Sequence, residues 1–167
     1  MEGRAMINLI MRALAFFWAL LVLAISGNMV AINSHNTNVI NYDLFVAIFA
    51  MLSLFYLIPA TLKDTFMIHP ILPLVLDVLN VIFWFCAAVA TAAELGAHSC
   101  SNGDYLDSNK ITQGSHKLCQ EGGATTAFLF FGFASFAVSL VFSGLGMGGG
   151  STGGKGGIRR GPAMSQV

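Results

Sequence analysis

Long apolar stretches alternate with short polar ones along the chain, and this pattern predicts the architecture. Four apolar runs have the length that a helix needs to cross a bilayer, about 20 residues. They cover residues 7–32, 42–62, 71–95 and 124–145. The runs lack the strict apolar–polar alternation of barrel strands, and a continuous helix satisfies its own backbone hydrogen bonds in lipid. The pattern predicts an all-α membrane protein, a four-transmembrane-helix bundle over residues 1–145.

Composition supports a membrane location. The chain has 167 residues, of which 56% are hydrophobic and 10% are charged, whereas a soluble domain carries about 25% charged residues. A chain this short cannot bury so much apolar surface in one water-facing core. The alternative for the first run is a cleaved signal peptide. That run is too long, and it lacks a compact apolar stretch followed by a small-residue cleavage site.

Basic residues predict the orientation through the positive-inside rule. Lys110 and Lys117 lie in the long segment before the fourth span, where acidic residues outnumber them. We therefore expect residues 33–41 and 96–123 to face outward, and both chain ends to lie in the cytosol. The other six of the eight basic residues all fall on the cytosolic side: Arg4, Arg12, Lys63, Lys155, Arg159 and Arg160.

Two cysteines share the outer segment and predict a disulfide. Cys100 and Cys119 would lie on the oxidising side of the membrane, where disulfides persist, and such a bridge stabilises by about 3 kcal/mol. Cys86 falls inside the third span, where a thiol behaves as a small hydrophobe. The alternative is a zinc site that combines the two outer cysteines with His98 and His116. The oxidising environment favours the disulfide.

The segment between these cysteines is polar and rich in turn-forming residues. On its own, it is interpreted as a structured connector that needs the bridge to be ordered. Its chemistry-bearing side chains, together with the histidine just before it, form the candidate outer-loop motif: His98, Tyr105, Asp107, Ser108, Asn109, Lys110, Thr112, Gln113 and Gly114.

The four spans, this loop and the terminal Ser165-Gln166-Val167 resemble the fungal non-classical export protein 2 family, a group of MARVEL-domain tetraspan proteins. The resemblance covers nearly the whole chain and includes His98, Cys100 and Cys119, but it does not extend to His116. It implies a MARVEL-like bundle in the plasma membrane, in the furrow-like domains called eisosomes. It also implies that the protein organises those domains, responds to sphingolipid and supports non-classical protein export.

Two of the three polar residues singled out inside the spans are expected to pair. A charge in the membrane core is costly and usually has a partner. Arg12 and Asp77 lie at similar depths in the first and third spans, and Asn80 shares a helix face with Asp77. We expect an Arg12–Asp77 pair with a structural role, and hence first and third helices that are neighbours or nearly so. The alternatives are a lipid-headgroup or proton-linked site, or an Arg12 that snorkels to the interface.

The fourth span carries small residues at a spacing that allows helices to approach closely. They are Gly132, Ser135, Ser139 and Ser143, and we expect them to pack within the bundle, with packing between copies as the alternative. Residues 146–167 form a glycine-rich segment, predicted to be a flexible cytosolic tail. Its terminal Ser165, Gln166 and Val167 fit the pattern of a PDZ ligand.

No catalytic constellation or phosphate-binding loop occurs in the sequence, so we predict no enzyme activity, no cofactor and no nucleic-acid partner. The favoured function is a non-enzymatic organiser of membrane domains. Its expected partners are membrane lipids such as sphingolipid or sterol, further copies of the chain, and cytosolic scaffold proteins. The alternative is a small transporter or channel. The spans offer too few polar residues for one: Asn8, Arg12, Asn28, Asp77 and Asn80.

Overall fold

The computed structural model describes residues 2–32, 37–62, 71–96 and 98–150, and this part of the chain contains helices and no strand. The four long helices are each long and apolar enough to cross a membrane, which confirms the predicted four-span architecture. A fifth, short helix lies between the third and fourth spans. The helices are α1 (Glu2–Ile32), α2 (Asn38–Leu62), α3 (Leu72–Leu95), α4 (Gly103–Ser108) and α5 (His116–Gly150).

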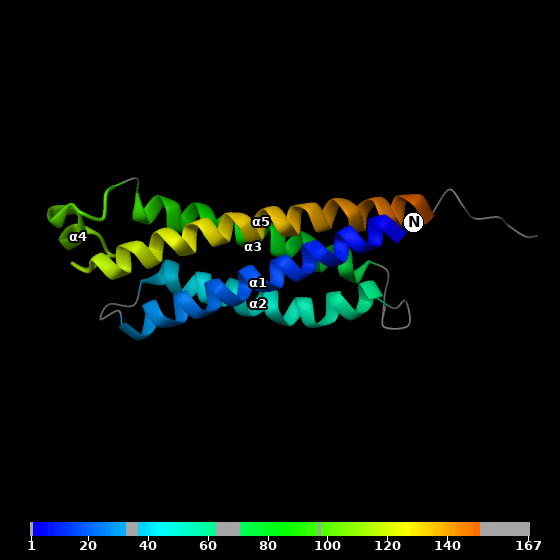
Figure 1. The fold of residues 1–167 in the computed structure, drawn as a ribbon, viewed down its shortest axis with the longest axis horizontal. Helices are drawn as coiled ribbons and strands as arrows, with labels where there is room; N and C mark the ends of the chain where they lie inside the picture. Colours follow the sequence, from blue (N-terminus) through cyan, green and yellow to red (C-terminus); the bar gives the residue numbers. More distant parts are fainter. Residues whose placement is uncertain (1, 33–36, 63–70, 97, 151–167) are drawn as a thin grey trace, which may run out of the picture.

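The four long helices form a bundle in which each one packs against two others. α1 packs against α2 and α5, and α3 packs against the same two helices. α1 and α3 therefore lie across the bundle from each other. Figure 1 shows α4 at one end, which we call the disulfide end. The N-terminus lies at the opposite end, which we call the terminal end, together with the last turns of α5.

The helices extend beyond the predicted apolar runs. α2 begins at Asn38 and not at 42, and α5 begins at His116 and not at 124. These added turns are polar. Hydropathy locates only the part of a helix that lies in hydrocarbon, whereas the helix itself can continue into the polar interface. α5 also continues to Gly150, five residues beyond the predicted end of the fourth span at 145. The terminal Ser165-Gln166-Val167 motif lies outside the described residues.

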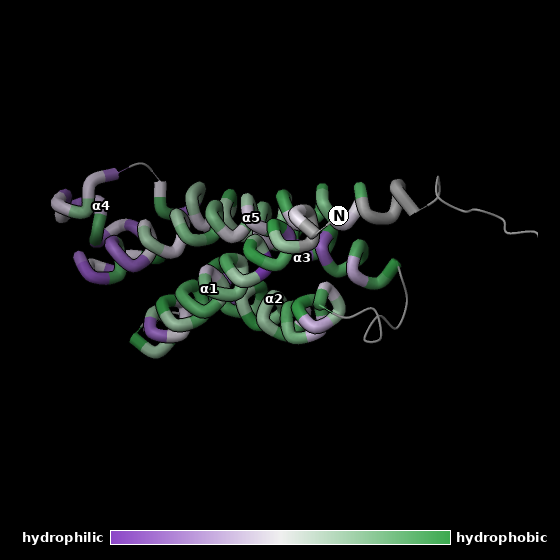
Figure 2. Tube along the Cα trace, turned by 45° about the vertical axis from the view of Figure 1, so that its right-hand side comes forward, coloured by the Kyte–Doolittle hydropathy of each residue, from purple (hydrophilic) through white to green (hydrophobic). Residues whose placement is uncertain are grey.

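The outer surface of the long helices is apolar, as contact with lipid requires. Figure 2 shows hydrophobic residues along the long helices, whereas hydrophilic ones gather around α4 and the neighbouring helix ends. The exposed side chains on this surface include Phe17, Leu52, Phe55, Phe85, Phe131 and Val141. Exposing these apolar side chains to water would be unfavourable, whereas lipid accommodates them. The bundle is therefore suited to a multi-pass membrane protein.

The centre of the core is built around Trp84 of α3, which is fully buried. Its ring packs against Phe136 of α5, with ring centroids 5.6 Å apart, and it covers Gly132. A Cβ atom at Gly132 would lie 1.9 Å from the Trp84 ring. Ser135 and Ser139 are buried on the same helix. The small residues of the fourth span therefore leave space for the Trp84 ring, and they pack within this bundle.

Replacing Gly132 with alanine is expected to destabilise the bundle by about 1–3 kcal/mol, because the added methyl group overpacks the core. Thermal unfolding of the purified protein in detergent, followed by circular dichroism, measures the effect. Gly123→Ala in the same helix is the matched control, since nothing lies within 4 Å of a Cβ atom there. Equal unfolding temperatures for the two variants would contradict the close Trp84–Gly132 contact.

Candidate functional site

The disulfide end is held together by a bond between Cys100 and Cys119, with the two Cα atoms 5.8 Å apart. The bond joins the loop after α3 to the second turn of α5, and it confirms the predicted bridge. Because both sulfur atoms form the disulfide, they cannot bind zinc as thiolates. The alternative zinc site therefore lacks two of its four proposed ligands. His98, a third member of that set, instead lies against the Tyr105 ring with centroids 4.8 Å apart.

The loop around α4 is anchored to the carbonyl groups that end α3. Such carbonyls have no partner within their own helix and need donors from elsewhere. The Tyr105 hydroxyl donates to the carbonyl of Leu95, and Asn109 Nδ2 donates to the carbonyl of Glu94 at 2.7 Å. Partial burial raises the pKa of Tyr105, which keeps its hydroxyl protonated as a donor. The loop therefore caps the third span.

Asn109 and Thr112 give the outer-loop motif its shape. Asn109 Oδ1 accepts hydrogen bonds from the backbone N–H groups of Ile111 at 2.8 Å and Thr112 at 3.4 Å, a side-chain turn that asparagine favours. The buried Thr112 hydroxyl donates to the carbonyl of Leu106 at 2.7 Å. Gly114 has a φ of +77°, and a Cβ atom there would lie 2.9 Å from Asp107 Oδ1. The turn therefore requires glycine.

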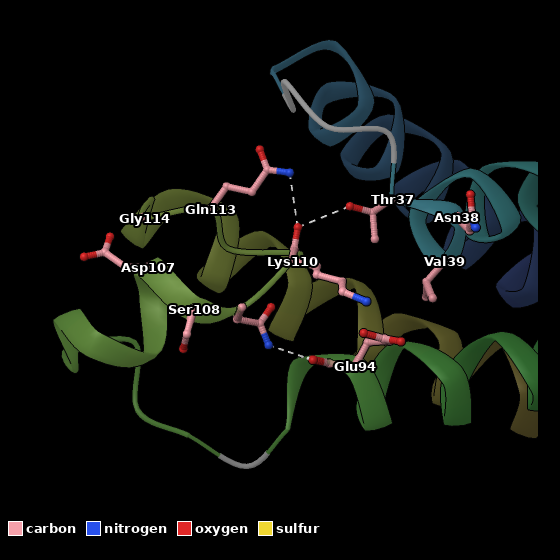
Figure 3. A pocket seen from close by; sticks show the side chains of 10 residues that line it. Thr37, Asn38, Val39, Glu94, Asp107, Ser108, Lys110, Gln113 and Gly114 are labelled. Atoms are coloured by element: carbon pink, nitrogen blue, oxygen red, sulfur yellow. Dashed lines mark hydrogen bonds between the residues drawn. The ribbon is translucent and has the colours of Figure 1, made fainter.

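A pocket of about 710 Å³ opens between this loop, the start of α2 and the end of α3 (Figure 3). It brings together six of the nine predicted motif residues, while His98, Tyr105 and Thr112 lie outside its lining. Its second wall comes from the start of α2 and from Glu94 of α3. Glu94 was expected near the outer end of the third span, but sequence reasoning missed the contribution of α2. The full lining consists of Thr37, Asn38, Val39, Glu94, Asp107, Ser108, Asn109, Lys110, Gln113 and Gly114.

A second group of polar residues lies inside the bundle near the terminal end. Arg12 Nη2 lies 2.9 Å from Asp77 Oδ2, and the two side chains are 2% and 0% exposed. Ser143 donates to the same carboxylate oxygen at 2.7 Å and accepts from Arg12 Nη2 at 3.2 Å. Asn8 accepts from Arg12 Nε at 3.3 Å. The expected ion pair is present, and Arg12 does not snorkel to the interface.

The arrangement of this pair corrects one prediction. α1 and α3 are diagonal and not adjacent, so the long arginine side chain crosses the interior to reach Asp77. Ser143, expected only as a packing residue, binds both partners. Nearby, Asn80 Nδ2 donates to Ser53 of α2 at 2.8 Å and to the carbonyl of Leu76 at 2.9 Å. The polar side chains thus connect all four spans.

Sequence reasoning missed Asp43, a fully buried residue of α2. The Thr91 hydroxyl of α3 lies 3.0 and 2.8 Å from its two carboxyl oxygens. With a predicted span start at 42, Asp43 falls at the edge of the second span, where a carboxylate can be solvated. The earlier helix start places it more than one turn inside. Its signal was an acidic residue within an apolar run, with a threonine in the neighbouring span.

Replacing Thr91 with valine is expected to destabilise the bundle by about 1–3 kcal/mol, because it removes the hydroxyl bonded to the buried Asp43. Thermal unfolding in detergent measures the loss, and Thr91→Ser should restore most of it. Thr126→Val is the matched control, since the Thr126 hydroxyl bonds only to the Gly122 carbonyl of its own helix. If Thr91→Val lowered the unfolding temperature no more than Thr126→Val does, the stabilising role of the Thr91–Asp43 hydrogen bond would be contradicted.

Asn28 and Glu121 form a further contact between spans at the disulfide end. Asn28 Nδ2 of α1 donates to Glu121 Oε1 of α5 at 2.7 Å, and Lys117 lies 3.6 Å from the same oxygen. Glu121 falls in the segment 96–123 that the sequence predicts to face outward, and the structure places it in α5. The contact helps to explain why α5 begins before its apolar run.

Comparison with known proteins agrees with this architecture. The family model for MARVEL, the membrane-associating domain, matches residues 5–142. Non-classical export protein 102 of Candida albicans is 41% identical over 138 residues, which is 81% of each chain. Non-classical export protein 2 of Saccharomyces cerevisiae is 30% identical over 141 residues, covering 83% of this chain and 80% of the relative.

A third similar protein, non-classical export protein 2 homolog 1 of Saccharomyces cerevisiae, is 35% identical over 141 residues, covering 84% of this chain and 80% of the relative. No solved structure matches the chain significantly. The domain match covers all four spans, and the similar proteins align over most of their length. This chain therefore belongs to the MARVEL family of membrane-associating domains and, within it, to the non-classical export protein 2 group.

Proposed function

We propose that this chain is a non-enzymatic tetraspan organiser of plasma-membrane lipid domains of the eisosome type. In this role it responds to sphingolipid and contributes to non-classical protein export. Its partners are membrane lipids, further copies of the chain and cytosolic scaffold proteins. The names of the similar proteins support the link to export. The apolar outer surface of the four spans supports a role performed in contact with lipid.

The observation that carries this proposal is the packed centre of the bundle. The polar residues near the terminal end, such as Arg12 and Asp77, are separated from those near the disulfide end, such as Asp43 and Thr91. Between the two groups lies a buried apolar cluster to which all four spans contribute. Among the described residues, this apolar cluster interrupts the polar side chains along the length of the bundle, which favours an organiser over a transporter or channel. Members of this cluster include Ala19, Val22, Ala47, Ala50, Trp84, Ala88, Leu129 and Phe136.

We propose that both chain ends face the cytosol and that the disulfide end faces outward. Disulfides persist on the oxidising side of the membrane, which supports an outward position for the Cys100–Cys119 bridge. Basic residues predominate along the chain around the start of α1, between α2 and α3 and after α5, which agrees with the positive-inside rule. In this orientation the pocket opens to the outside.

Two measurements on the unaltered protein test the function. Liposomes that contain the purified protein should be no more permeable to small ions and solutes than protein-free liposomes. In cells that lack the gene, furrow-like membrane domains should be fewer, and expression of this chain should restore them. A protein-dependent flux in liposomes would favour the transporter alternative, and normal domains in the deleted cells would overturn the organiser.

A further inference from the structure

The pocket at the disulfide end lies at the ends of two of the candidate membrane spans. Val39 is in the first turn of the α2 span and Glu94 in the last turn of the α3 span. Its volume of about 710 Å³ falls within the range of small-ligand sites, about 300–1,000 Å³. A group held here can be part of a lipid molecule whose chains lie along the helices.

The backbone around Lys110 is fixed before any ligand binds. The carbonyl of Lys110 accepts hydrogen bonds from Thr37 Oγ1 at 3.2 Å and from Gln113 Nε2 at 3.2 Å. Asn109, its neighbour, is bonded to the end of α3, and the disulfide closes the same loop. A site that is ordered in advance loses less entropy on binding. These contacts distinguish the pocket from a loose surface loop.

Three charged side chains line the pocket: Glu94, Asp107 and Lys110. Asp107 points away from the other two (Figure 3), so the opposite charges of Lys110 and Glu94 are the ones that face each other. Figure 3 shows the Lys110 ammonium and the Glu94 carboxylate pointing toward each other from opposite walls. The ion pairs within 4.0 Å among the described residues are Arg12–Asp77 and Lys117–Glu121, so Lys110 and Glu94 are not paired. A simple anion would meet the Glu94 charge here, and a simple cation would meet Lys110. A ligand with both charges complements the pocket.

The lining also indicates which kind of cation fits. None of the ten lining residues is aromatic, whereas quaternary ammonium groups are typically bound by aromatic rings. A primary ammonium group has three N–H donors, like that of lysine. It can donate to the Glu94 carboxylate, which lines the pocket. A lysine ammonium is a common partner for phosphate.

We propose that this pocket binds an amine-bearing zwitterion such as phosphoethanolamine, with the ligand's ammonium group at Glu94 and its phosphate at Lys110. This inference deepens the proposed role in lipid organisation and rests on it. The same chemistry occurs in a phosphatidylethanolamine headgroup and in free O-phosphoethanolamine, and the experiment distinguishes these two sources.

The test begins with nanodiscs that contain the full chain and equal amounts of phosphatidylethanolamine, phosphatidylcholine and phosphatidylglycerol. Native mass spectrometry of the released protein should show preferential retention of phosphatidylethanolamine. Adding O-phosphoethanolamine tests the source. Displacement of the lipid shows that the headgroup alone is recognised, whereas continued retention assigns the site to the lipid. Equal retention of the three lipids would overturn the proposal and leave only an open surface pocket.

Single substitutions test the two charges. Lys110→Ala and Glu94→Gln should each weaken the retention of phosphatidylethanolamine by about tenfold or more, since each removes a charge-assisted hydrogen bond. Glu94→Lys should shift the preference toward phosphatidylglycerol, because the pocket then carries two positive charges. Both side chains are exposed, so these variants should fold normally. Unchanged lipid preference in all three variants would overturn the assignment.

Matched controls lie close to the pocket but outside its lining. Lys117→Ala removes an exposed lysine of α5, and Asp104→Asn removes an exposed carboxylate of α4. Both variants should retain phosphatidylethanolamine as the wild type does. If the wild type shows no lipid preference while membrane domains still depend on the protein, the pocket inference fails and the organiser function stands. Retention by the wild type with domains that do not need the protein would instead overturn the organiser function.

Discussion

Replacing Asp77 with alanine is expected to destabilise the bundle by about 3–5 kcal/mol, since it leaves a buried arginine without its counter-charge. Arg12 is 2% exposed and its guanidinium crosses the interior, so it cannot reach water without moving α1. Ser143 and Asn8 remain as neutral acceptors, and they cannot balance the charge. Unfolding in detergent with increasing dodecyl sulfate, followed by circular dichroism, measures the loss.

A double variant separates the cost of a lone charge from the value of the pair. Arg12→Met with Asp77→Leu removes both charges and fills the space with apolar side chains, a change that is often neutral or stabilising. The double variant should therefore be more stable than Asp77→Ala. Asp104→Ala, at an exposed position of α4, is the control and should be neutral. If the double variant were as unstable as Asp77→Ala, the argument from an unbalanced charge would be wrong.

Replacing both Cys100 and Cys119 with serine is expected to lower stability by about 2–5 kcal/mol, because the open loop gains entropy in the unfolded state. The thermal unfolding temperature should fall, and it should no longer respond to a reducing agent. Cys86→Ala is the matched control, since its thiol lies on the exposed face of α3 and forms no disulfide. A reducing agent without effect on the wild-type unfolding temperature would contradict this prediction.

The destabilisation caused by losing the disulfide should be concentrated at one end of the bundle. The bond joins Cys100 to α5, whereas the contacts of Trp84 and Arg12 lie further along the spans. Hydrogen exchange of the double serine variant should be faster in residues 103–114 and unchanged in the middle of the four long helices. Faster exchange throughout the spans would show that the bridge supports the whole bundle. The same measurement reports whether the pocket lining is intact.

Much of the architecture could be predicted because the relevant signals are local. A run of about 20 apolar residues crosses a bilayer as a helix whatever its neighbours are, and two cysteines in one short outer segment have few alternatives. The Arg12–Asp77 pair was also predictable, since a charge deep in a span requires a partner and the described spans hold few candidates. Asp43 was missed because the predicted start of its helix was four residues late.

The arrangement of the helices around the bundle required the tertiary structure. Sequence reasoning expected the first and third helices to be neighbours, or nearly so, because their charges pair. The structure instead places them on a diagonal, since an arginine side chain is long enough to cross the interior. The contact between Trp84 and Gly132 could not be predicted either, because it depends on the relative height of α3 and α5.

The four spans could be read from the sequence alone, and the disulfide and the Arg12–Asp77 pair were its favoured alternatives. Hydrophobicity, chain proximity and the cost of a lone charge act over short distances or admit few partners. That Asn38, Glu94 and Lys110 line one pocket follows from the folded structure and not from the sequence. They come from three separate segments, and no periodicity in the sequence relates them. Their proximity depends on how α2, α3 and the disulfide-closed loop meet at the end of the bundle.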